Sequence, residues 1–254
     1  MIAVQNSAAP VRIGDGIARF EALDAGFVNW AREWEAEEAQ FPALIDRPTL
    51  ERAEYSQAFP HLLMSACACV DPAQPLARLL ASENLVPSNW LLSPAVCYHA
   101  YLLWEHAVLD APRILTARGR CFRHEAEFVP TRRQIEFEMR EIVLCGPADW
   151  IAERAFEARR RIDAMGDALG VEATWEVASD PFFLPTARGK AFVQRLQETK
   201  QEFVVRNPEP LAIASINRHG TFFGERFHIG LAAGGAAHTA CIAFGLDRWA
   251  GVLN

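Results

Sequence analysis

The sequence predicts an α+β fold in which antiparallel strands form a sheet and helices cover the outside of that sheet. Three segments indicate this fold. Residues 120–143 contain two strand-like runs separated by a charged loop, which is the pattern of an antiparallel pair. Residues 148–169 carry apolar side chains at helical spacing and end before Gly170, a residue type that commonly terminates helices. Residues 210–218 form an apolar run typical of a buried strand.

The N-terminal half contains helical and strand-like segments in turn. Residues 17–38 predict a long helix, because large apolar side chains recur there at helical spacing. These side chains are Phe20, Leu23, Phe27, Trp30 and Trp34. A short strand-like piece around Pro42 follows. Residues 48–66 are expected to form a helix and then a strand, and residues 84–109 contain an amphipathic helix after Pro94.

The C-terminal half continues this mixture. Residues 171–179 alternate between apolar and polar side chains and predict a strand. Residues 187–203 predict a helix that carries four cations, namely Arg188, Lys190, Arg195 and Lys200. Residues 219–229 are expected to be a loop and an edge strand. We expect residues 1–254 to form a single domain, with the segment at 187–203 as an insertion that could dock a partner.

Composition narrows the classes of function. Half of the residues are hydrophobic, so a sizeable core can be buried, and the net charge of −7 argues against a broad nucleic-acid-binding surface. The sequence shows no secretion signal and no apolar run of the ~20 residues that span a bilayer. We therefore expect a cytoplasmic protein without a membrane partner. Its six scattered cysteines favour reduced thiols or metal ligands over a disulfide framework.

The charged loop within residues 120–143 holds the first candidate site. Arg123 and Glu125 are expected on the outgoing strand, where alternate residues share one face, and Arg133 and Phe137 near the start of the return strand. An arginine can clamp phosphate through paired donors, a carboxylate can accept from the amine of adenine, and an aromatic ring can stack on the base. The alternative is a charged hairpin with solvated faces.

These residues resemble a family signature. Arg-x-Glu, a loop and Arg-x-x-x-Phe is similar to the second motif of class II aminoacyl-tRNA synthetases, and the Gly-Leu-x-Arg run ending at Arg248 resembles the third. The helix at 17–38 with the strand around Pro42 resembles the first motif, which forms the dimer interface in that class. The resemblance implies the class II catalytic fold and a homodimer. It also implies an ATP site formed by Arg123, Glu125, Arg133, Phe137 and Arg248, with Mg²⁺ accompanying ATP and Arg123 as the catalytic phosphate clamp.

A second resemblance implies a metal. The chain is similar to the amino acid:[carrier protein] ligases, small homologues of the atypical zinc-containing archaeal seryl-tRNA synthetases. In those proteins a Cys, a Glu and a Cys hold a catalytic zinc, and the matching residues here are Cys97, Glu141 and Cys241. Three such ligands leave one position of tetrahedral zinc open for the α-amino group of a substrate, so Glu141 also belongs to the substrate site. Cys121 is the rival ligand, and each cysteine alone could equally be a buried hydrophobe.

The resemblance implies an ATP-dependent ligase. It would activate glycine, alanine or serine as an aminoacyl-adenylate and pass the aminoacyl group to the phosphopantetheine thiol of an acyl or peptidyl carrier protein. The cations Arg188, Lys190, Arg195 and Lys200 are the candidate docking patch for that acidic partner, with a solvated helix face as the alternative. Two other functions stay open: a tRNA-charging enzyme with a separate RNA-binding subunit, and a non-catalytic amino-acid sensor. One departure concerns Mg²⁺, because Ala212 stands where class II enzymes often carry a glutamate, and Glu209 could replace it.

Overall fold

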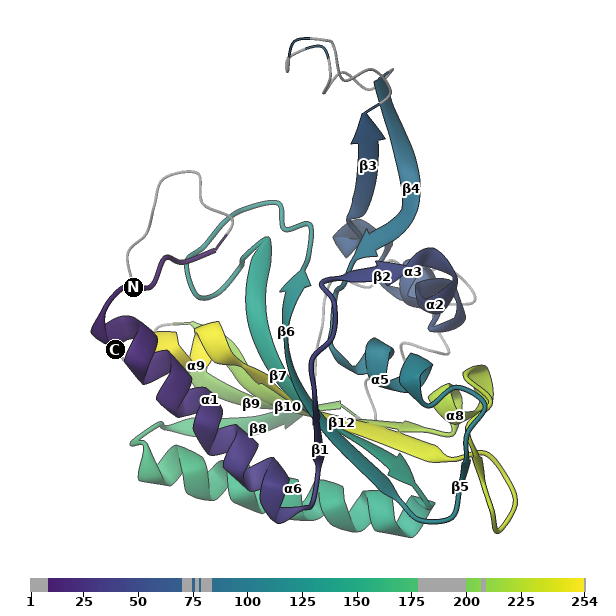
Figure 1. Ribbon diagram of the computed structural model, residues 1–254. Coiled ribbons are helices and arrows are strands. Elements are labelled where there is room, and N and C mark those ends of the chain that lie inside the picture. Colours follow the sequence, from purple (N-terminus) through teal and green to yellow (C-terminus); the bar gives the residue numbers. More distant parts are fainter. Residues whose placement is uncertain are drawn as a thin grey trace.

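The computed structural model describes residues 9–69, 75, 78, 84–177, 200–206 and 209–253. Within these residues, a seven-stranded sheet forms the centre of the molecule (Figure 1). All of its neighbouring strands are antiparallel except β1 and β6, which are parallel. In the order in which they pair, the strands are β1 (Glu37–Ala39), β6 (Arg113–Phe122), β7 (Glu136–Gly146), β12 (His238–Gly245), β10 (Pro210–Gly220), β9 (Lys200–Arg206) and β8 (Ala173–Val177).

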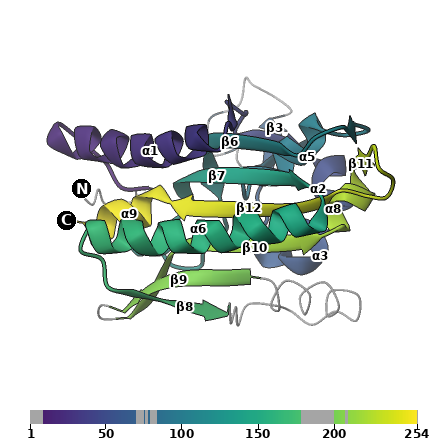
Figure 2. The same ribbon diagram turned by 90° about the horizontal axis from the view of Figure 1, so that it is seen from below.

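Three helices cover one face of this sheet. They are α1 (Asp15–Glu33), α6 (Ala148–Ala168) and α9 (Leu246–Val252). Figure 2 shows α6 lying along the middle strands β12 and β10, and α1 lying nearer to β6 and β7. A core fills the space between helices and sheet, and its centre is the stacked pair of Phe27 and Phe244, with ring centroids 3.9 Å apart. The predicted helix at 148–169 is therefore confirmed. The one predicted at 17–38 is confirmed as far as Glu33, but its predicted end is wrong because residues 37 and 38 belong to β1. Each helix packs its apolar side against the sheet.

The opposite face of the sheet carries a second core under two short helices. These are α5 (Cys97–Leu103) and α8 (Phe222–Arg226). Because successive residues of a strand point to opposite faces, Ile142 of β7 belongs to the first core and Val143 to the second. By the same alternation Glu141 and Cys241 lie on the face that α5 and α8 cover, which is where the candidate site is found.

A smaller sheet projects from the main body beyond α5 (Figure 1). It pairs β2 (Leu44–Asp46) and β3 (Ser65–Cys69) with β4 (Leu85–Leu92). Short helices lie beside it, namely α2 (Arg47–Arg52), α3 (Tyr55–Ala58) and the 3₁₀ turn η1 (Pro60–Leu62), and a separate two-stranded sheet joins β5 (Val108–Leu109) to β11 (Gly230–Leu231). The helix expected within residues 48–66 is confirmed, but the strand expected after it begins only at Ser65, as β3. The strand β4 was not indicated by its sequence.

Two expected elements are wrong. Residues 219–229 were expected to be a loop and edge strand, but they contain the helix α8, which buries Phe223 against Tyr101 in a stack with centroids 4.3 Å apart. The expected helix at 187–203 does not extend to its predicted end, because Lys200 begins β9. Phe203, Val204 and Val205 of β9 are buried in the sheet, and aromatic and β-branched side chains favour that setting. The remainder of that segment, up to residue 199, lies outside the described residues.

A buried ion pair links α1 to the sheet. Arg140 of β7 donates two hydrogen bonds to the carboxylate of Asp24, at 2.6 and 2.8 Å, and both side chains are buried. We expect Asp24→Ala to lower the free energy of unfolding by about 3 kcal/mol, because it leaves the Arg140 charge buried without its main partner. Glu21 is a matched control, since it lies one turn away on α1 and pairs with Arg118 at 2.8 Å while half exposed. Glu21→Ala should cost less than about 1 kcal/mol in denaturant unfolding, and equal losses in the two variants would contradict this account.

Among the described helices, none has the length and apolar character needed to cross a membrane.

Candidate active site

The loop between β6 and β7 holds three of the predicted site residues. The paired register of these strands ends at Phe122 and Glu136. The backbone N–H of Arg123 still bonds to the carbonyl of Ile135 at 3.0 Å, but the N–H of Glu125 bonds back to the carbonyl of Arg123 at 2.9 Å. The chain therefore turns at this point. The prediction that Arg123 and Glu125 lie on the strand is wrong by a few residues, although both side chains still enter one cavity.

That cavity, called the charged cavity here, has a volume of about 100 Å³ and is lined by Arg123, Glu125, Phe137 and Arg248 among others. Arg133 lines an adjoining outer cavity of about 460 Å³, which also contacts Arg123, Glu125 and Arg248. The five residues predicted for an ATP site therefore gather in two connected hollows, although they come from distant parts of the chain.

The guanidinium groups in the charged cavity are held in defined positions. Arg248 donates to the backbone carbonyl of Ala212 at 2.8 Å and to that of Arg132 at 3.0 Å. The guanidinium carbon of Arg123 lies 5.0 Å from the centre of the Phe137 ring, and Glu125 pairs with Arg133 at 3.8 Å. Fixed cations beside a partly buried carboxylate and an aromatic ring form an arrangement that can bind phosphates and a purine base.

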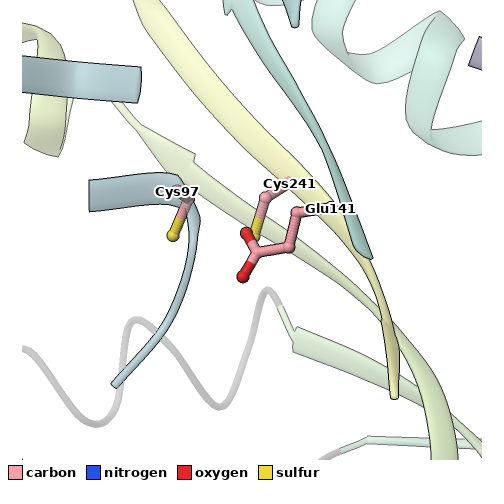
Figure 3. A group of neighbouring side chains, drawn as sticks. All are labelled: Cys97, Glu141 and Cys241. Carbon is pink, nitrogen blue, oxygen red and sulfur yellow. The ribbon is translucent and has the colours of Figure 1, made fainter. Parts of the chain in front are cut away.

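The predicted metal ligands form a compact cluster. Cys97 is the first residue of α5, Glu141 lies in β7 and Cys241 in β12, and their ligand atoms are all within 4.8 Å of one another. Figure 3 shows the three side chains pointing toward one another. All three residues are buried. Cys121, the rival ligand, is also buried but does not belong to this cluster.

The electrostatics of the cluster fit a cation. One carboxylate oxygen of Glu141, Oε1, accepts a hydrogen bond from the backbone N–H of Val96 at 3.1 Å, whereas Oε2 has no hydrogen-bond partner among the described residues. Burial raises the pKa of Glu141. The pKa of Cys97 is raised by its hydrogen bond to Cys241, by burial and by the charge of Glu141. Glu141 and Cys97 thus resist ionisation, a divalent ion between the three side chains would stabilise them as anions, and two thiolates favour a borderline-soft metal such as zinc.

The cluster lines a third hollow, the cluster cavity, with a volume of about 160 Å³. His219 lies on its wall, with Nε2 4.0 Å from Sγ of Cys241. Burial lowers the pKa of His219 to about 3, so its ring is neutral at physiological pH. Nδ1 of His219 lies 3.3 Å from the Tyr101 hydroxyl and 3.2 Å from the Thr239 hydroxyl, which fixes the ring. His219 therefore shapes this cavity without adding charge to it.

The other predicted site residues fall in different places. Arg188, Lys190 and Arg195 lie outside the described residues. Lys200 lies on β9 and lines the cavities, so the prediction that it shares a helix with them is wrong. Glu209, the possible replacement for a Mg²⁺ ligand, has an 80% exposed side chain and pairs with Arg132 at 3.6 Å.

Some residues of the site were missed by the sequence analysis. Arg132 and Glu202 line both the charged and the outer cavity, and the buried Asp247 lines the charged cavity. Asp247 accepts a hydrogen bond from the backbone N–H of Glu138 at 2.6 Å, which ties the start of α9 to β7. Asp247 directly precedes Arg248 in the third motif, and this position could have identified it as a site residue. No sequence signal identifies Glu202, because its place in the site depends on which strands are neighbours.

Comparison with known proteins gives the family. No protein-family model matches the chain. Two curated proteins of Bradyrhizobium diazoefficiens, amino acid–[acyl-carrier-protein] ligases 2 and 1, are 36% and 31% identical to it over 243 and 239 residues. These alignments cover 89% of the chain in both cases, and 71% and 73% of the relatives. The chain belongs to the amino acid–[acyl-carrier-protein] ligase family. This confirms both the predicted family and the prediction of a ligase.

More distant relatives extend the family relationship. The type-2 serine–tRNA ligase of Methanocaldococcus jannaschii is 23% identical over 240 residues, covering 84% of this chain and 46% of that protein. The solved seryl-tRNA synthetase of M. kandleri, in complex with A. aeolicus tRNASec, matches with a TM-score of 0.81 at 24% identity, over 96% of this chain and 53% of that one. A cytoplasmic serine–tRNA ligase of Naegleria fowleri, in complex with AMP, matches with a TM-score of 0.70 at 12% identity, over 94% of this chain and 49% of that one. The class II synthetase catalytic fold is thereby confirmed.

Proposed function

We propose that the chain activates a small amino acid with ATP and transfers the aminoacyl group to the phosphopantetheine thiol of a carrier protein. The observation that carries this proposal is the contact between the charged cavity and the cluster cavity, which share Arg123 as a wall residue. A nucleotide in the first and an amino acid in the second would meet at that side chain. The carrier protein as acceptor follows from the names of the two Bradyrhizobium relatives.

The nucleotide roles follow from the chemistry of the charged and outer cavities. Arg123 would bind the α-phosphate, and Arg133 the outer phosphates, because a guanidinium offers paired donors to phosphate oxygens. Phe137 and Arg248 would take opposite faces of the adenine ring, and Glu125 would accept from its amine. Magnesium would accompany the ATP and be held largely by phosphate and water, since Glu209 is exposed and Ala212 has no ligand atom.

Cys97, Glu141 and Cys241 would hold one zinc ion. When bound, this zinc supplies an open coordination position for the α-amino group of the amino acid. The protein would then position the two substrates for reaction, because the amino acid would bind on one side of Arg123 and the nucleotide on the other. The cluster cavity of about 160 Å³ also holds Tyr98 and Phe223 in its wall, which supports a small substrate such as glycine, alanine or serine.

The test is amino-acid-dependent pyrophosphate exchange, followed by transfer assays with two acceptors. We expect exchange with at least one small amino acid, and labelling of a phosphopantetheinylated carrier protein. The same carrier without its phosphopantetheine arm is the matched control. Efficient charging of tRNA in place of the carrier would support the tRNA-charging alternative, and amino-acid binding without pyrophosphate exchange would support a sensor.

The predicted docking site for the carrier consists of Arg188, Lys190 and Arg195. An acidic chain needs a local basic patch to attract an acidic partner, and such charges mainly raise the association rate. Reversing Arg195 to Glu should slow transfer to the carrier and leave pyrophosphate exchange near the parent rate. An unchanged rate of transfer at low salt would exclude Arg195 from the docking site. Lys200 is omitted from this patch because it lines the cavities.

A further inference from the structure

Two cationic side chains, Arg123 and Lys200, line the charged cavity, the outer cavity and the cluster cavity alike. Arg123 lies in the loop after β6, and Lys200 is the first residue of β9. The two side chains therefore come from different parts of the fold and line the region that the three cavities share. Arg123 already has a role in the proposed function, whereas Lys200 has none.

The place of Lys200 in the sheet explains its contact with the cluster cavity. Lys200 is paired with Asn217 of β10 in the strand ladder. The side-chain amide of Asn217 lies 3.3 Å from Sγ of Cys241 and 3.1 Å from the hydroxyl of Ser215. Lys200 is thus the ladder partner of a residue that contacts Cys241, one of the three candidate metal ligands.

An ion pair holds the Lys200 side chain. Its Nζ lies 2.6 Å from Oε1 of Glu202, and the two side chains are 26% and 24% exposed. Residues two apart on a strand share a face, so both project toward the charged cavity, which both line. Glu202 pairs in the ladder with Ser215, another residue shared by the charged and cluster cavities. This enclosed setting differs from the open exposure of a charge that guides a partner protein.

We propose that Lys200 is a second cationic catalytic residue of adenylate formation and that Glu202 positions it; this inference rests on the proposed function. In that step a carboxylate oxygen of the amino acid bonds to the α-phosphorus of ATP. The bond from that phosphorus to the oxygen bridging to the β-phosphorus breaks, and pyrophosphate leaves with the electron pair. No proton is transferred. Two anions must approach one another, and an ammonium group beside Arg123 offsets their repulsion in an enclosed cavity.

Kinetics of pyrophosphate exchange test this role. Lys200→Met should lower kcat by about 100-fold, with a smaller change in the KM for ATP, because a positioned cation acts mainly in the transition state. Lys200→Arg keeps the charge and should recover activity to within about tenfold of the parent. Glu202→Gln should lie between the parent and Lys200→Met. Should Lys200→Met melt well below the parent, Lys200→Gln replaces it, with the same expectation.

Arg206→Met is the matched control. Arg206 is a cation of the same strand, it pairs with Glu176, and it lines none of the three cavities. Its exchange rate should equal that of the parent. An exchange rate for Lys200→Met above about one third of the parent, or a defect confined to transfer onto the carrier, would overturn the role of Lys200. If the parent shows no pyrophosphate exchange with any amino acid tested, the proposed function itself would be contradicted.

Discussion

Arg123→Ala should lower the rate of pyrophosphate exchange by at least about 100-fold, which corresponds to about 3 kcal/mol of lost transition-state stabilisation. Arg123 lines all three cavities of the candidate active site and lies 5.0 Å from the Phe137 ring centre. Its removal takes away the charge at the point where the nucleotide and the amino acid would meet. Arg123→Lys should retain part of the activity, because it keeps a charge but loses the paired donors.

Arg120 offers the matched control for Arg123. It lies in β6, three residues earlier, with a 63% exposed side chain that pairs with Glu136 at 3.0 Å, and it lines none of the three cavities. Arg120→Ala should leave pyrophosphate exchange and the melting temperature close to those of the parent. If Arg123→Ala keeps more than about a tenth of the parent rate, another residue holds the α-phosphate.

Periodicity predicted the long elements of the fold correctly. The helices α1 and α6 and the strands β7 and β10 have apolar patterns that persist over several turns or pairs, so local sequence suffices to identify them. The short helix α8 was missed because five residues give little periodicity, and its stability depends on packing Phe223 against Tyr101 from a distant segment. The sequence predicted Lys200 at the end of a helix, whereas its pairing with Asn217 of β10 places it in a strand.

The residues of the candidate site also differ in whether the nearby sequence is enough to identify them. Arg123, Glu125, Arg133 and Phe137 lie within one short stretch, so a motif can identify them. The cluster of Cys97, Glu141 and Cys241 is spread over most of the chain, and from the sequence alone only the resemblance to a family groups these residues. Glu202 belongs to no motif. It enters the site because β9 pairs with β10, and strand order cannot be deduced from the composition of a single strand.

Zinc content provides the second test with a large expected effect. The parent should contain one zinc per chain, and Cys97→Ser and Cys241→Ser should each lower this to less than about a tenth, because a hydroxyl replaces a thiolate ligand. The ligand atoms already lie within 4.8 Å of one another, so little rearrangement is needed to bind the ion. Glu141→Gln should weaken zinc binding less, since it keeps an oxygen but removes the charge.

Cys121→Ser distinguishes a ligand from a merely buried thiol. Cys121 is as buried as the cluster cysteines, and burial raises its pKa, but its sulfur is not part of the cluster. This variant should therefore keep its zinc. Removal of zinc from the parent by a chelator should also lower the melting temperature, since a ligand that binds the folded state stabilises it, and added zinc should restore both the melting temperature and pyrophosphate exchange. Full zinc occupancy in Cys97→Ser and Cys241→Ser would exclude this cluster as the metal site, and loss of zinc in Cys121→Ser alone would move the site to the end of β6.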